Sequence, residues 1–336
     1  ATSSPDLIDW PTFYGVQQTG EITASFSSFG TFGNNYNRSS LLPAWPNFSF
    51  STPGNSAVEY LYGGAIWIGG IVGDDTLVSV GHDGWHAVYE FNPTNFATPG
   101  SQGTVTRLNS IADFSMRAEF SDTADLLNIP ADPNYGPHKP LNLKISNRSY
   151  AWHTYPQNKT IIYDMVITNV GNEPIYDGYI GFYFDADVGA GYESWFDDLT
   201  GSFRNLGIGY IIDNDGDLAG TTGPPAPRIF TFKFLNNSFN AYDTSFNWWT
   251  SNSPQFDFGP RQRGTPENPF RDFGTGGFGT PLGDANKYYV MRFREWDYDQ
   301  IQTYSIGNDD SIWLEPNPVN DFDFSDGHDA RFLMSL

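Results

Sequence analysis

Short apolar runs separated by glycine, proline or aspartate are the feature of this sequence that most constrains its fold. Val58–Tyr62, Ala65–Ile71 and Thr76–Val80 are such runs, and they are rich in β-branched and aromatic residues. Residues of these types favour strands, whereas the glycines and aspartates between them favour tight turns. No segment keeps an apolar stripe of helical period with caps over three turns, and Ala112–Leu127 is the best helical candidate. The pattern predicts an all-β fold.

The middle of the chain contains the most regular strand pattern. Thr160–Thr168 reads as one strand, Asn169–Pro174 has the composition of a turn, and Ile175–Phe184 reads as a second strand. We therefore expect these two strands to pair as a hairpin. Later strand candidates follow the same rule, and they are Gly207–Ile212, Arg228–Phe234, Tyr288–Phe293 and Arg331–Met334.

Many short strands joined by loops are typical of stacked antiparallel sheets. We expect an antiparallel β-sandwich, either one large sandwich or two that pack together, with long aromatic and glycine-rich loops. The proline-rich segment 128–140 suggests an N-terminal β region over 1–135 and a C-terminal sandwich over 136–336. Interleaving of the two halves into one domain is the alternative. Segment 236–284 shows no convincing strand but many aromatic residues, so it is expected to be a long packed loop.

The charge balance limits the partners of this chain. It carries 39 acidic and 17 basic residues for a net charge of -22, and it has no cysteine. Nucleic acid and anionic membranes would repel such a protein, and no apolar run is long enough to span a bilayer. With 17% aromatic residues the chain is not a disordered acidic tail. We expect a secreted protein without nucleic-acid partners or membrane insertion.

Clustered aspartates indicate a metal site. Asp213-Asn-Asp-Gly-Asp217 places alternate carboxylates in a glycine-containing turn, which suits a hard cation with six to eight oxygen ligands. The glycine and glutamate spacing of an EF-hand is absent. The predicted ligands are Asp185, Asp187, Asp197, Asp198, Asp213, Asp215 and Asp217. Calcium is the expected ion, with a solvated turn as the main alternative and magnesium or manganese as a further one.

Aromatic residues in the long loop raise the question of carbohydrate binding. Trp248 and Trp249 could stack on sugar rings, so they are the predicted ligand-binding residues. A glycosidase would need two carboxylates about 5 to 10 Å apart, and a chain this acidic always offers some such pair. No nucleophile elbow, phosphate loop or dinucleotide fingerprint occurs. We therefore expect no catalytic residues and no enzyme.

Eight phrases of the sequence stand out in their order along the chain, and they are Gly64–Gly70, Val78–Gly81, His138–Leu141, Ile167–Gly171, Gly181–Gly189, Trp195–Asp198, Ile211–Asp217 and Asp329–Ser335. Together they resemble an uncharacterised family of secreted β-rich proteins of Bacteroidota-like bacteria, which often carry a type IX secretion sorting tail. The resemblance implies secretion, β-sandwich architecture and a role at a surface or in a matrix, and it implies no catalytic residues. The chain departs from the family where Arg331-Phe-Leu usually leads into a further strand and a sorting domain.

These observations lead to one functional expectation and two alternatives. The expectation is an extracellular or cell-surface structural protein, a calcium-stabilised β subunit that assembles with copies of itself into a filament or surface layer. Sheet edges and the aromatic segment 236–284 would make the contacts between copies. The alternatives are a carbohydrate-binding module, with polysaccharide as its partner, and a glycoside hydrolase.

Overall fold

The fold is taken from a computed structural model. The residues it describes are 14–33, 58–84, 89–94, 105–123, 137–190, 198–213, 229–235, 244–250, 262–265, 268–271, 281, 283–292 and 329–336.

The described residues are mostly in strands, with one α-helix and short 3-10 turns. In chain order the elements are β1 (Tyr14–Thr19), β2 (Ile22–Ser27), β3 (Thr31–Gly33), β4 (Val58–Glu59), β5 (Gly63–Val72), β6 (Asp75–Val80), β7 (Asn92–Pro93), β8 (Thr106–Arg107), β9 (Phe114–Ser121), β10 (Leu143–Ala151), η2 (Gln157–Lys159), β11 (Ile161–Asn169), β12 (Tyr176–Asp185), β13 (Gly189–Ala190), β14 (Asp198–Phe203), η3 (Arg204–Leu206), β15 (Ile208–Asp213), β16 (Ile229–Lys233), β17 (Ser245–Thr250), β18 (Gln262–Thr265), β19 (Asn268–Arg271), α1 (Gly283–Arg292) and β20 (Ala330–Ser335).

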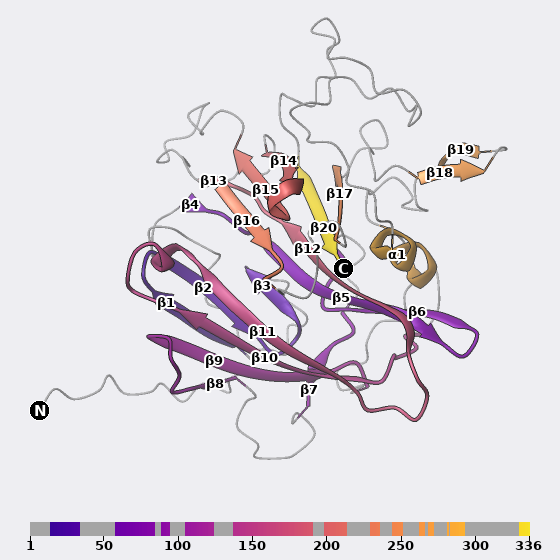
Figure 1. Ribbon diagram of the computed structural model, residues 1–336, viewed down its shortest axis with the longest axis horizontal. Coiled ribbons are helices and arrows are strands. Elements are labelled where there is room, and N and C mark those ends of the chain that lie inside the picture. The colour runs from indigo at the N-terminus through magenta and orange to yellow at the C-terminus, as the bar shows by residue number, and fades with distance from the viewer. Residues whose placement is uncertain are drawn as a thin grey trace, which may run out of the picture.

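Antiparallel sheets make up the architecture, as the sequence predicts (Figure 1). The largest sheet has eight strands in the order β1-β2-β3-β5-β12-β20-β17, and β6 also pairs with β5. A five-stranded sheet follows the order β11-β10-β9-β7, with β8 on β9, and a three-stranded sheet follows β14-β15-β16. β13 pairs with β4, and β18 pairs with β19. The eight-stranded sheet takes strands from both sides of segment 128–140.

The central strands of the eight-stranded sheet are buried on both faces. Because side chains alternate along a strand, Ile66 and Phe182 point to one face while Trp67 and Tyr183 point to the other. The first face packs against the five-stranded and three-stranded sheets and forms the larger apolar core. The second face packs against α1, whose Met291 is buried there. A sheet covered on both faces explains why its strands are apolar nearly throughout.

The predicted hairpin between 160–168 and 175–184 is wrong, although both strands exist. β11 pairs with β10 in the five-stranded sheet, whereas β12 pairs with β5 and β20 in the eight-stranded sheet. The turn between them therefore crosses from one sheet to the other. The physical reason lies in their composition: β11 carries an exposed residue at almost every second position, whereas the second half of β12 is buried on both faces.

Two elements have the opposite type from the one predicted: the helical candidate contains a strand, and one strand candidate is part of a helix. Phe114–Ser121 within the helical candidate is the strand β9, which is paired with β10 along its whole length. Tyr288–Arg292 within a strand candidate belongs to α1 instead. That helix begins at Gly283, whose φ of 70° suits glycine, and Asp284 occupies its first turn. Long-range pairing and packing override weak local preferences in both places.

The segment expected to lack strands contains three, namely β17, β18 and β19. β17 pairs with β20 over six residues inside 236–284, and its aromatic side chains enter the apolar cores on both faces of the sheet. The Asn and Ser residues in and around β17 interrupt the apolar pattern by which a strand is recognised in the sequence. The proposed boundary region 128–136 lies outside the described residues.

Candidate functional site

Acidic side chains converge where β12 ends beside the start of β20. Asp185 lies opposite Arg331 in the register of these two strands. The guanidinium of Arg331 forms ion pairs with Asp185, at 3.0 Å from Nε to Oδ1, and with Asp329, at 3.0 Å from Nη2 to Oδ1. All three residues are buried. Charges buried in this way need partners, and a planar guanidinium with several donors can serve two carboxylates at once.

A third carboxylate joins this cluster. One carboxylate oxygen each from Asp185, Asp187 and Asp329 lie within 4.8 Å of one another. Oxygen ligands of a calcium ion surround it at about 2.3 to 2.6 Å, so this spacing is compatible with a shared hard cation. Three carboxylates carry more negative charge than one guanidinium neutralises, which favours a further cation. We call Asp185, Asp187, Asp329 and Arg331 the acidic cluster.

Two more predicted ligands lie on the neighbouring three-stranded sheet. Asp198 and Asp213 are opposite each other in the β14–β15 register, and both are buried. The backbone N–H of Val188 donates to Oδ1 of Asp198 at 3.1 Å, which ties β14 to the turn just after Asp187. Like charges directly across a strand pair destabilise it unless something compensates.

The predicted metal ligands are thus only partly placed. Asp185 and Asp187 meet in the acidic cluster, and Asp198 contacts the residue that follows Asp187. Asp197, Asp215 and Asp217 lie outside the described residues. Asp329 was not among the predicted ligands, because only the pairing of β20 with β12 brings it there. Its proximity in sequence to a basic residue of an apolar strand, Arg331, was the available signal.

The two tryptophans predicted to bind ligand are core residues, and this corrects the prediction. Trp249 is fully buried, with its ring stacked on Tyr183 at 5.8 Å between centroids. Trp248 is buried on the opposite face of the sheet, in the larger core. Adjacent strand residues point to opposite faces, and both faces of this sheet are covered. Neither ring therefore presents a face on which a sugar could stack.

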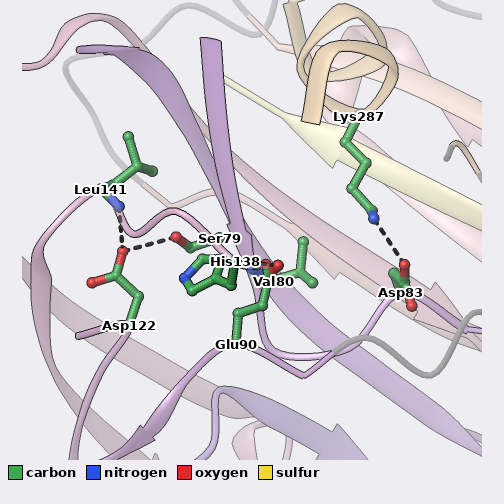
Figure 2. Close-up of polar contacts among 8 residues, drawn as sticks. All are labelled: Ser79, Val80, Asp83, Glu90, Asp122, His138, Leu141 and Lys287. Carbon is green, nitrogen blue, oxygen red and sulfur yellow. Dashed lines mark hydrogen bonds and ion pairs between the residues drawn. The ribbon is translucent and has the colours of Figure 1, made fainter. Parts of the chain in front are cut away.

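A second polar group, which sequence reasoning missed, lies around the end of β6, and one of its ion pairs joins this region to α1 (Figure 2). Nζ of Lys287, on α1, is 2.8 Å from Oδ2 of Asp83, just after β6, and both side chains are buried. Burial alone would lower the pKa of Lys287, but the charges of Asp83 and Glu90 outweigh it and raise the pKa. Lys287 therefore remains an ammonium.

His138 and Glu90 form the centre of this second group. Nδ1 of His138 is 3.0 Å from Oε1 of Glu90, and the other carboxylate oxygen of Glu90 accepts the backbone N–H of Val80 at 2.8 Å. Burial acts to lower the pKa of His138, but Glu90, helped by Asp122 and Asp284, raises it above its ordinary value. The imidazole thus favours its charged form.

Asp122 completes the group on the side of the five-stranded sheet. Its carboxylate accepts the hydroxyl of Ser79 at 2.8 Å and the backbone N–H groups of Leu141, at 2.8 Å, and Leu143, at 2.7 Å. Burial raises the pKa of Asp122 despite these hydrogen bonds. The hydrogen bonds join β6 to the segment that leads into β10.

Asp284 is the acidic residue of this group with the largest resolved change. Burial, followed by the charge of Glu90, raises its pKa to about 6, although the backbone of Val78 and the ammonium of Lys287 act against this. We call Asp83, Glu90, Asp122, His138, Asp284 and Lys287 the buried charge network. Its members come from four separate stretches of sequence, and no local motif announces them.

The buried charge network is suited to holding elements together. Ser79 is completely buried and its hydroxyl already donates to Asp122, while the side chains of His138 and Glu90 are each 7% exposed. A nucleophile or general base must reach a substrate atom within hydrogen-bond distance. In the described geometry these side chains instead form hydrogen bonds and ion pairs with one another and with backbone N–H groups.

Comparisons with known proteins add no family to this description. No family model matches the chain, and a search of curated proteins gives no match. Among the described residues, no helix combines the length and the apolar character needed to cross a bilayer.

Proposed function

We propose that this chain is an extracellular structural subunit, stabilised by calcium, that assembles with copies of itself into a filament or surface layer. The observation that carries the proposal is the convergence of Asp185, Asp187 and Asp329 on one point beside Arg331. A divalent cation there would join the end of β12 to the start of β20. Such a site serves rigidity, since these are neighbouring strands of the largest sheet.

Open strand edges support self-association. Within the described part of the chain, β11 is the terminal strand of its sheet. It exposes Val166, and Val170 and Tyr176 are also exposed nearby in sequence. An edge strand with exposed apolar side chains is a template for pairing with another chain. Copies of this chain are the partner proposed here. The cysteine-free composition is consistent with secretion, and the family resemblance supports it.

Electron microscopy and light scattering of the purified chain test the proposal. With millimolar calcium we expect filaments or layers, and with excess chelator we expect smaller species and a melting temperature several degrees lower. Asp187→Asn should weaken the calcium effect on melting, whereas Asp74→Asn, an exposed turn substitution, should leave it unchanged. A monodisperse monomer at high concentration in calcium would contradict assembly, and an identical melting curve in chelator would contradict the metal.

A further inference from the structure

An apolar cavity separates the sheets on the side opposite α1. Its volume is about 630 Å³, within the range of about 300 to 1,000 Å³ typical of small-molecule pockets. The floor comes from β2, β3 and β12, one wall from β11 and the other from β16. These are the same β11 and β16 that end their respective sheets in the described part of the chain.

Aromatic rings dominate the lining. Phe182 lies at the centre of a ring cluster, with centroid separations of 6.0 Å to Phe32, 4.9 Å to Phe232 and 5.6 Å to Phe234. Tyr163 packs edge-on against Phe32 at 4.9 Å from the opposite wall. Rings held against one another leave a rigid apolar cavity, and each methylene transferred into it from water contributes about 0.8 kcal/mol.

The charged residues that line the cavity are both lysines. Lys159 has a side chain that is 45% exposed, and its Nζ is 3.6 Å from Oε2 of Glu21. Lys233 is exposed on β16, and it has no ion pair within the described ranges. Exposed residues that also line a cavity lie at its rim. A lining whose charged residues are both lysines is a local departure from a chain with 17 basic and 39 acidic residues.

We propose that this cavity binds one long-chain carboxylate. The hydrocarbon chain lies among the rings of β12 and β16, and the carboxylate lies at the exposed edge of the cavity, where Lys159 and Lys233 supply positive charge. The combination of an apolar, ring-lined interior with cationic groups at its exposed edge selects a molecule with one apolar body and one anionic end. This proposal does not rest on the acidic cluster or on the proposed function, although β11 both lines the cavity and ends its sheet.

Displacement of a fluorescent fatty-acid probe measures the binding, with dodecanoate, dodecanol and dodecyltrimethylammonium as competitors below their micelle concentrations. We expect dodecanoate to displace the probe most strongly and the ammonium compound least. The double variant Lys159→Glu/Lys233→Glu should weaken dodecanoate about tenfold, because two attractions of up to about 1 kcal/mol become repulsions. Dodecanol should bind this variant as it binds the unchanged protein.

A cavity-filling variant checks the location. Ile161 lines the cavity from β11 and lies on the same strand face as Tyr163, so Ile161→Trp adds a ring to the space. It should reduce displacement by every dodecyl compound. Ile111→Trp, at an exposed position outside the lining and outside β11, is the control. Equal binding of dodecanol and dodecanoate, unchanged binding by Ile161→Trp, or no binding by the unchanged protein would each overturn the proposal.

Discussion

The ammonium of Lys287 lies 2.8 Å from the carboxylate of Asp83, and their side chains are 3% and 0% exposed. This ion pair is the polar link between the only α-helix among the described elements and the loop that follows β6. A buried pair contributes little net stability over an apolar pair, but removal of one partner leaves a charge in a medium that cannot solvate it. The position of α1 therefore depends on both residues together.

Removal of the ammonium should be strongly destabilising. We expect Lys287→Met to lower the free energy of unfolding by about 3 to 5 kcal/mol, since Asp83 loses its buried cation. Urea unfolding followed by circular dichroism gives the value. Lys139→Met is the control, because Lys139 pairs with Asp75 on the surface and such pairs contribute at most about 1 kcal/mol. Similar losses in the two variants would show that the buried pair has no special role.

Substitution of Asp284 should stabilise the protein at alkaline pH. The folded pKa of about 6 is above the unfolded value of 3.8, so the contribution of this group to stability is lost as pH rises through that interval. Asp284→Asn removes the loss, and we expect a gain on the order of 1 to 2 kcal/mol at pH 8 that vanishes near pH 3.5. Urea unfolding at both values measures it. Asp74→Asn should show no such difference, and a less stable Asp284→Asn at pH 8 would mean that the helix dipole outweighs burial.

His138 should make stability fall as pH rises. Its folded pKa is raised above 6.5, so the stability it contributes is fully present below 6.5 and is lost as pH rises through the folded pKa. At pH 6 we expect His138→Gln to be about 2 kcal/mol less stable, because Glu90 loses a charged partner. The variant should also show a flatter pH dependence in thermal unfolding. An NMR titration of the His138 imidazole that gives a pKa below 6.5 would refute the raised pKa.

Arg331 should be replaceable by calcium. Arg331→Met leaves Asp185 and Asp329 without their guanidinium, and in chelator we expect a loss of about 3 to 5 kcal/mol. Calcium should stabilise this variant more than it stabilises the unchanged protein, because the cation would neutralise the carboxylates that have lost the guanidinium. Thermal unfolding with increasing calcium measures the restoration. Equal calcium responses in the two proteins would argue against a cation site in the acidic cluster.

Strand identity could be predicted wherever the composition was one-sided. β5, β6, β15, β16 and β20 all lie within or overlap the runs identified from β-branched and aromatic content. Pairing could not be predicted, because a strand such as β12 carries the same apolar side chains whichever neighbours it has. β9 was predicted as helix and part of α1 as strand, which shows the limit of local preference. The secondary structure of each segment depends on the elements that pack against it.

Only part of the acidic cluster could be predicted from the sequence, for a related reason. Asp185 and Asp187 stand out as neighbours in sequence, whereas Asp329 is 144 positions from Asp185 and arrives through the pairing of β12 with β20. The buried charge network left no local signature. From the sequence alone, an isolated histidine, lysine or aspartate is expected at the surface, and only the tertiary structure shows that it is buried.

Composition by itself determined the all-β class and the acidic character, because both follow from summed preferences of individual residues. Only the tertiary structure decided which carboxylates share a point in space, that Trp248 and Trp249 are core residues, and that Lys287 is buried against Asp83. Those properties arise from contacts between distant segments and from the loss of water around them. Such contacts exist only once the sheets and α1 have packed.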